Sequence, residues 1–158
     1  MSRHTVVVEW ERVEGAFTDQ RYSRRHRWRF DGGLDVPGSS SPDVVRVPYS
    51  DPAAVDPEEG FVAALSSCHM LTFLSLAARA GLRVDRYIDL CEAVMERNAQ
   101  GREAVTRATL KPEVVFSGDK SPGAGEVERL HHEAHEQCFL ANSVKTEIDV
   151  QGSWRHAE

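Results

Sequence analysis

Three cysteines, Cys68, Cys91 and Cys138, are the residues of this 158-residue sequence best suited to chemistry. A cysteine reacts as its thiolate, which forms at neutral pH only where a cation or a helix N-terminus lowers the thiol pKa. Cys68 and Cys138 each fall in a predicted helix, so packing of the two helices can bring their sulfur atoms together. The alternative interpretation is that both are small core residues, as free cysteines often are. Cys91 falls in a predicted strand, where we expect a structural role.

Arginines are the cations available to a reactive thiol at Cys68. This residue lies about three turns past Pro57, near the start of its predicted helix, and the helix dipole acts only within the first turn. A basic cluster near the N-terminus supplies the charge, and it comprises Arg21, Arg24, Arg25, His26, Arg27 and Arg29. The alternative interpretation of this cluster is a solvated, charged edge strand.

Histidines close to both cysteines raise the question of a metal site. His131, His135 and Cys138 occur at i, i+4 and i+7 of a predicted helix, and three such ligands with an open fourth position suit a catalytic zinc. A solvated, histidine-rich helix face explains the same spacing, so we predict no bound metal and no cofactor. His69 follows Cys68 directly and points about 100° away from it on a helix, so we expect a structural role for His69.

The helix that carries Cys68 is predicted over residues 56–81. Asp56 can cap its first turn, Pro57 fits its first position, and Gly81 suits its C-terminal cap. No side chain between residues 60 and 78 is charged, and apolar residues occur on every face, which is typical of a helix buried all round. A membrane span is the alternative, but the polar group in its middle and the lack of a basic flank disfavour it.

The remaining elements surround this helix. The predicted strands are residues 5–10, 21–30, 34–36, 44–47, 87–96, 104–116 and 143–150. The first three form an antiparallel meander, and residues 87–96 pair with residues 104–116 as a hairpin. A second, amphipathic helix spans residues 126–138, with Cys138 on its apolar face. The pattern predicts one α+β domain over residues 1–158, with antiparallel sheets packed around a buried central helix.

Composition limits the partners of the protein. A net charge of -6 and a pI near 5.6 argue against binding to nucleic acid or to an anionic membrane, so we expect a small substrate. The sequence enters its first strand without an apolar leader, and its few, irregularly spaced cysteines suit a reducing compartment, so we expect a cytoplasmic protein. A helix buried on all faces needs more cover than one small sheet provides, which predicts a homodimer.

The sequence resembles the OsmC/Ohr family of osmotically inducible proteins and organic hydroperoxide resistance proteins. Three stretches carry the resemblance: DGGLDV at residues 31–36, DPEE leading to AALSSC at residues 56–68, and AHEQC at residues 134–138. It implies an intertwined α+β homodimer with two active sites at the subunit interface. It also implies thiol-dependent reduction of organic hydroperoxides, with a dithiol reductant, of unknown identity, that restores the enzyme.

The resemblance also assigns roles to single residues. Cys68 resembles the peroxidatic cysteine, Cys138 the resolving cysteine, and Glu58 the glutamate that pairs with an activating arginine. Arg24 is the first choice for that arginine and Arg25 the second. The Cys68 thiolate attacks the peroxide and becomes a sulfenic acid, which condenses with Cys138 to a disulfide. About 15 Å of straight helix separates Glu58 from Cys68, so a long arginine, a helix break or a partner residue has to close the gap.

Two positions depart from the family pattern. Phe139 follows Cys138 where proline is common, and His69 stands where an apolar residue is usual. These departures indicate a divergent OsmC-like subgroup. The alternative function is a non-enzymatic OsmC-like protein that binds an apolar small molecule in the dimer-interface cleft, and the thiol reactivity of Cys68 distinguishes the two.

Overall fold

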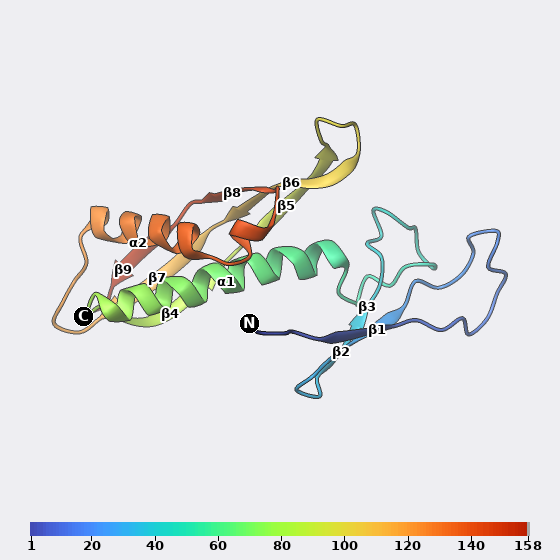
Figure 1. The fold of residues 1–158 in the computed structure, drawn as a ribbon, viewed down its shortest axis with the longest axis horizontal. Coiled ribbons are helices and arrows are strands. Elements are labelled where there is room, and N and C mark those ends of the chain that lie inside the picture. The colour runs from blue at the N-terminus through green and yellow to red at the C-terminus, as the bar shows by residue number, and fades with distance from the viewer. Residues whose placement is uncertain (158) are drawn as a thin grey trace. The chain divides into compact units, whose positions relative to one another are not determined.

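A computed structural model describes residues 1–157 of the chain, which divide into two compact units. The first unit is Met1–Gly60, and the second begins at Phe61. Small three-stranded sheets and two α-helices make up the described chain, with a short 3₁₀ helix, Ala141–Ser143, near its end (Figure 1). The predicted α+β class is therefore confirmed.

The first unit contains the predicted antiparallel meander. Its strands are β1 (Val6–Glu9), β2 (His26–Phe30) and β3 (Asp35–Gly38), in the spatial order β1-β2-β3. The turn between β2 and β3 uses Gly33 at a φ of 85°, a conformation that glycine adopts without steric cost.

Two predictions for the first unit are wrong. The strand predicted over residues 21–30 begins only at His26, because the Arg24 N–H bonds to the Tyr49 carbonyl in a loop instead of to a neighbouring strand. The strand predicted over residues 44–47 is absent, because the N–H groups of Val44 and Val45 turn back to the Ser41 carbonyl. Both segments satisfy their backbone groups locally, so no ladder forms.

The meander packs closely against the start of the long helix α1 (Pro57–Arg79). A Cβ atom on Gly60 would lie 2.6 Å from the Trp28 ring, so the missing side chain of Gly60 leaves room for the indole in its present position. The Trp28 indole N–H donates to His26 Nε2 at 2.9 Å, and His26 therefore carries its own proton on Nδ1, which donates to the Arg24 carbonyl at 2.8 Å. The packing of Trp28 on Gly60 and these two hydrogen bonds connect the first turn of α1 to the loop that carries Arg24.

Helix α1 begins and ends as predicted. The Asp56 carboxylate accepts the Glu59 N–H at 2.8 Å, and the Glu59 carboxylate accepts the Asp56 N–H at 3.1 Å, which forms a capping box. At the other end, Gly81 adopts a φ of 72° and donates its N–H to the Ala78 carbonyl. Both ends therefore depend on the residues that the sequence pattern singled out.

The second unit contains a long hairpin that bends between two sheets. Its strands are β4 (Arg83–Asp89), β5 (Glu92–Arg97), β6 (Glu103–Leu110) and β7 (Pro112–Ser117), so each predicted strand of the hairpin is broken into two. β4 pairs with β7 and β5 pairs with β6, both antiparallel. At the bend the Asp89 carboxylate accepts the Lys111 N–H at 2.6 Å and the hydroxyl of Ser66 on α1. The carboxylate thus holds the corner of the hairpin to the helix.

The C-terminal segment is also broken into two strands, next to the bend of the hairpin. β8 (Glu147–Val150) pairs in parallel with β6, and β9 (Ser153–His156) pairs in parallel with β7. The strand predicted over residues 143–150 begins only at Glu147, and a further strand follows it, because Gln151 and Gly152 let the chain cross from one sheet to the other. The sheets β4-β7-β9 and β5-β6-β8 are therefore built from the same three chain segments, each broken once.

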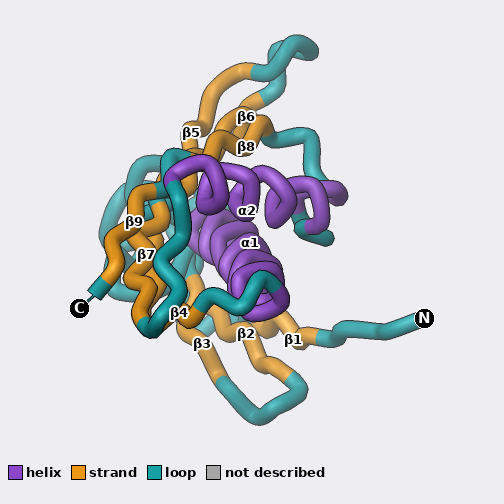
Figure 2. Tube along the Cα trace, turned by 90° about the vertical axis from the view of Figure 1, so that its left-hand side faces the viewer, coloured by secondary structure: helices purple, strands orange, loops and turns teal. Residues whose placement is uncertain are grey.

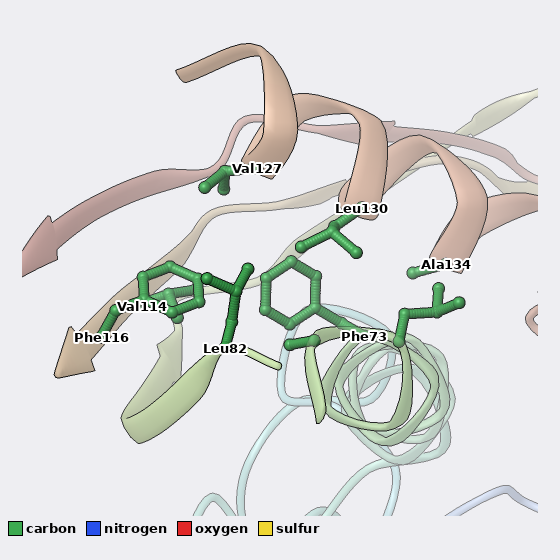
Figure 3. Close-up of a cluster of buried hydrophobic side chains, with 9 residues drawn as sticks. Phe73, Leu82, Val114, Phe116, Val127, Leu130 and Ala134 are labelled. Atoms are coloured by element: carbon green, nitrogen blue, oxygen red, sulfur yellow. The ribbon is translucent and has the colours of Figure 1, made fainter. Parts of the chain in front are cut away.

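Both helices of the second unit lie on the same face of sheet β4-β7-β9 (Figure 2). The second helix, α2 (Ala124–Gln137), matches its predicted span within two residues. Figure 3 shows the core between these layers, with residues from α1, the strands and α2. Its buried members are Phe73, Leu76, Ala77, Leu82, Val114, Phe116, Val127, Leu130 and Ala134.

Within the single chain, α1 buries one stripe of its surface. The buried residues are Leu65, Ser66, His69, Phe73, Leu76 and Ala77. Leu71 on another face remains 61 % exposed, so the predicted burial on all faces is not reached in one chain. By length and composition α1 could cross a membrane, but its buried stripe packs in a core and carries hydrogen-bonded polar side chains, as in the core helix of a globular protein.

Candidate functional site

Cys68 and Cys138 lie together in the second unit. Cys68 is half-buried in the middle of α1, and Cys138 is 2 % exposed. Cys138 is the C-terminal cap of α2, with extended backbone angles, instead of a residue on the face of the helix as predicted. The chain leaves the helix at this residue, and the Cys138 thiol comes within interaction range of the Cys68 thiol. The expectation that packing of the helices brings these two sulfur atoms together is met.

The loop that carries Cys138 is bonded almost entirely to itself. The Cys138 carbonyl accepts the Asn142 N–H at 3.1 Å and the Asn142 side-chain amide at 3.0 Å. The Ser143 hydroxyl donates to the Phe139 carbonyl at 2.7 Å, and the Ala141 N–H lies 3.5 Å from the Cys138 sulfur. These bonds give the loop a fixed shape, so its position follows the position of α2.

The two thiols differ in their environments. Burial raises the pKa of Cys138, and the neighbouring Cys68 thiol raises this pKa further, while the Ala141 N–H acts in the opposite direction. At neutral pH Cys138 is therefore a protonated thiol and a hydrogen-bond donor. Of the two cysteines, the half-buried Cys68 is the one more accessible to a substrate.

Arg24 and Glu58, the other two predicted site residues, lie in the first unit. The Arg24 guanidinium donates to the carbonyls of Gln20 and Tyr22 at 2.7 and 2.6 Å, and its Cζ atom lies 3.8 Å from the centre of the Tyr22 ring. Glu58 is half-buried in the first turn of α1 and makes no ion pair with Arg24 within residues 1–157. The roles assigned to both residues stay predictions.

Arg25, the second choice for the activating arginine, lies in a different environment. It forms an ion pair of 2.7 Å with Asp51, so its charge is already balanced. Arg24 bonds only to neutral groups among the described residues, so no carboxylate there balances its charge. This difference favours Arg24 over Arg25.

The histidines beside the cysteines form a buried pair. His69 Nε2 and His131 Nδ1 lie 3.1 Å apart, and the two side chains are only 1 % and 7 % exposed, respectively. Burial is the main cause and the neighbouring histidines add to it, and together they lower the pKa of each to about 4, so the pair is neutral at pH 7. The interpretation of His131 as part of a solvated helix face is wrong. The sequence signal for its burial is its position in the apolar stripe with Val127, Leu130 and Ala134.

The remaining candidates have simpler surroundings. Among residues 1–157, no three His, Cys, Asp or Glu side chains come together as metal ligands, and His135 is only half-buried beside the buried pair. Cys91 is half-buried next to the bend of the hairpin and forms no disulfide. Ser66 lies two residues before Cys68 on α1, and its hydroxyl donates to the Asp89 carboxylate. This pair was not singled out in the sequence analysis. No short motif marks them, because they meet only through the bend.

Comparisons with known proteins identify the family of the chain. The family model of OsmC-like proteins matches residues 50–152, which is more than half of the chain. The chain is 51 % identical to an OsmC-like protein of unknown function from Vibrio cholerae, and the match covers 97 % of this chain and 100 % of that one, with a TM-score of 0.95. None of the curated proteins matches the chain.

Solved structures with lower identity share the fold. The organic hydroperoxide resistance protein OhrB of Bacillus subtilis is 16 % identical over 98 % of each chain, with a TM-score of 0.63. An organic hydroperoxide resistance protein from Elizabethkingia anophelis is 14 % identical over 99 % of each chain, with a TM-score of 0.64. The family model and the Vibrio relative decide the assignment, and the chain belongs to the OsmC-like protein family.

Proposed function

We propose that this protein is a thiol-dependent peroxidase that reduces organic hydroperoxides. The observation that supports this most is the close approach of two unlike thiols: Cys68, half-buried on α1, and Cys138, buried and protonated at the end of α2. A structural pair of core cysteines has no need for one member to reach the surface. A peroxidatic cysteine has to meet its substrate, and a resolving cysteine has to meet the peroxidatic one.

The reaction proceeds in two steps. The Cys68 thiolate attacks the terminal oxygen of the hydroperoxide, the O–O bond breaks, and an alkoxide leaves and takes up a proton to become an alcohol. Cys68 is then a sulfenic acid. The Cys138 sulfur attacks the Cys68 sulfur, the S–O bond breaks, and water leaves with the Cys138 proton, which forms a disulfide. An external dithiol reduces this disulfide in a reducing compartment such as the cytoplasm.

Arg24 is the cation that we assign to the Cys68 thiolate, with Glu58 as the carboxylate that orients it. Support for Arg24 comes from its rigid loop, where bonds to two carbonyls and contact with the Tyr22 ring leave its charge unbalanced. Removal of the cation takes away the charge that we propose stabilises the Cys68 thiolate, so peroxide attack at pH 7 has to slow. Arg25 is the matched control, since it is one residue away and already paired with Asp51.

A homodimer completes the proposal. Leu71 on α1 and Phe139 beside Cys138 are 61 % and 83 % exposed in the single chain, and exposed apolar groups of this kind mark contact surfaces. A second copy that covers these residues would also exclude water from the thiols. Light scattering at low micromolar concentration should give the mass of two chains, and a stable folded monomer would contradict this part of the proposal.

The test of the function is turnover with a dithiol reductant. We expect consumption of cumene hydroperoxide faster than that of hydrogen peroxide, complete loss of turnover in Cys68→Ser, and near-parental turnover in Cys91→Ser. Arg24→Ala should lower the rate at pH 7 by at least tenfold and recover part of it at higher pH, whereas Arg25→Ala should stay within about threefold of the parent. No turnover by the parent would favour the alternative, a non-enzymatic protein that binds an apolar small molecule.

A further inference from the structure

We propose that the buried pair His69–His131 is a positioning device that holds the Cys138 thiol in place for disulfide formation with Cys68. The proposal rests on the proposed function for its chemistry, but its geometric content can be measured without a peroxide. His69 directly follows Cys68 on α1, and His131 precedes Cys138 by seven residues, two turns, on α2. Each histidine therefore fixes the helix that carries one of the thiols.

The pair provides the specific contact between the two helices. Within residues 1–157, the bond between His69 Nε2 and His131 Nδ1 is the only hydrogen bond from α1 to α2. The other contacts between the helices are apolar and come from the core around Phe73 and Leu130. Apolar contacts are non-directional, so they allow small sliding or rotation, whereas a buried hydrogen bond fixes one register.

The His131 ring is also confined by its other neighbours. It lies nearly parallel to the rings of His69, at 8°, and of Phe73, at 23°, with centroid separations of 5.4 and 4.3 Å. Its far edge faces Gly152, where a Cβ atom would come within 2.6 Å of Nε2. His131 is thus held by α1 on one side and by the break between β8 and β9 on the other.

The position of the Cys138 thiol follows the position of α2 through the loop after this helix. The loop is bonded to itself and to the end of α2, so apart from the contact between the Cys138 and Cys68 thiols no hydrogen bond in the described chain holds Cys138 to α1. The distance between the thiols then depends on the register of the helices. Disulfide formation, which needs the Cys138 sulfur in line with the S–O bond of Cys68, should be sensitive to that register. Attack on the peroxide needs only Cys68 and should not depend on that register.

The experiment compares two amides at the same position. In the Cys91→Ser background, His69→Gln keeps a polar atom near the place of Nε2, and His69→Asn is one methylene shorter and cannot reach His131. Equilibration with reduced and oxidised glutathione measures the effective concentration of Cys138 toward Cys68, as two glutathiones are released for each protein disulfide formed. We expect His69→Asn to lower this effective concentration at least tenfold and His69→Gln to stay within about threefold of the parent.

A second pair of variants and a control complete the test. His131→Asn keeps a polar atom near the place of Nδ1, and His131→Leu does not. We therefore expect His131→Leu to lower the effective concentration of Cys138 more than His131→Asn does. Val127→Ala truncates a buried core residue near the start of α2 and should destabilise the fold without changing the effective concentration. Equal values for the Asn and Gln variants of His69, and for the Asn and Leu variants of His131, would overturn the proposal.

Kinetics then separate this inference from the proposed function. With cumene hydroperoxide in a single turnover, His69→Asn should keep the rate of Cys68 oxidation within about twofold and slow the appearance of the disulfide at least tenfold. A parent that fails to react with the peroxide but shows the expected glutathione equilibria would refute the peroxidase and leave the positioning pair intact. Equal slowing of both steps would refute the pair, because it would mean a general structural effect.

Discussion

The two units of the chain are stabilised in different ways. The second unit has a closed core in which Phe73, Phe116 and Ala134 are fully buried. The first unit has a three-stranded sheet in which every residue of β1 is exposed, and surface ion pairs such as Arg29–Glu9 connect its strands. A small sheet with apolar side chains in water is marginal by itself. The first unit therefore depends on cover from outside its own sheet, and the second does not.

This difference separates the parts of the proposed site. The thiol pair of Cys68 and Cys138 belongs to the self-sufficient unit, whereas Arg24 and Glu58 belong to the dependent one. On the proposed function, the disulfide chemistry is therefore built into the stable core of each chain. The activating charge that we propose comes from a segment that needs a further partner for cover, and we propose a second copy as that partner.

Truncation of the core should give the largest effect. Phe116→Ala removes a fully buried ring between α1 and the sheet, and we expect a loss of about 3–5 kcal/mol in the free energy of unfolding by urea. Val8→Ala in β1 should cost less than about 0.5 kcal/mol if that strand remains exposed in solution. A loss of 1 kcal/mol or more for Val8→Ala would show that β1 is covered in solution, as the proposed second copy would cover it.

Acid should act on the second unit through its buried histidines. His69 and His131 have pKa values lowered from 6.5 to about 4, so the unfolded chain takes up protons more readily between these values. The stability that the neutral pair confers is complete above pH 6.5 and is lost as the pH falls toward 4, with an upper limit of about 3 kcal/mol for each histidine. Asp89 opposes this shift at His69 and His135 adds to it.

Urea unfolding at pH 7 and at pH 4.5 measures this loss. The double variant His69→Leu, His131→Leu should remove most of the difference between the two pH values, provided that it folds at pH 7. Should that variant not fold, nuclear magnetic resonance titration of the parent imidazoles gives the two pKa values directly. Imidazole pKa values near 6.5 would contradict the prediction.

Two glycines provide a matched comparison of the units. Gly152→Ala places a Cβ atom 2.6 Å from the His131 ring, which is buried and confined, so we expect a loss of about 1–3 kcal/mol. Gly60→Ala places a Cβ atom equally close to Trp28, but that ring is only half-buried and can move, and alanine favours the helix by about 1 kcal/mol. Gly60→Ala should therefore change the stability by less than about 1 kcal/mol. Equal losses would mean that the first unit is as tightly packed as the second.

The surface ion pairs should matter least. Arg29 and Glu9 lie 2.6 Å apart and are both about half-exposed, so water and salt screen their attraction. We expect Glu9→Gln to lower the free energy of unfolding by less than about 1 kcal/mol, and the difference should vanish in 1 M salt. A loss that persists at high salt would indicate that the pair is buried in an assembly.

Local patterns in the sequence predicted the helices well. Asp56, Glu59 and Gly81 cap α1 because their bonds lie within one turn of the chain, and the apolar stripe of α2 has a regular period. The breaks in the strands were not predictable in the same way. The bend at Asp89 depends on Ser66 and Lys111, which lie more than twenty residues away along the chain.

The candidate site was predictable only in part. The two cysteines could be assigned because their helices and their order match a family pattern, and the structure brings them together. The burial of His131 was missed because a histidine-rich segment reads as polar, whereas the core accepts one imidazole that is paired with His69. The role of Arg24 stays a prediction, since Arg24 and Cys68 belong to different units.

The central claim is that Cys68 and Cys138 form a redox pair, and mass spectrometry after a single equivalent of cumene hydroperoxide tests it most directly. We expect a disulfide between Cys68 and Cys138 in the parent, one added oxygen on Cys68 in Cys138→Ser, and an unmodified Cys91 in both. An unmodified Cys68 in both proteins would contradict the account and leave the fold without a peroxidase function.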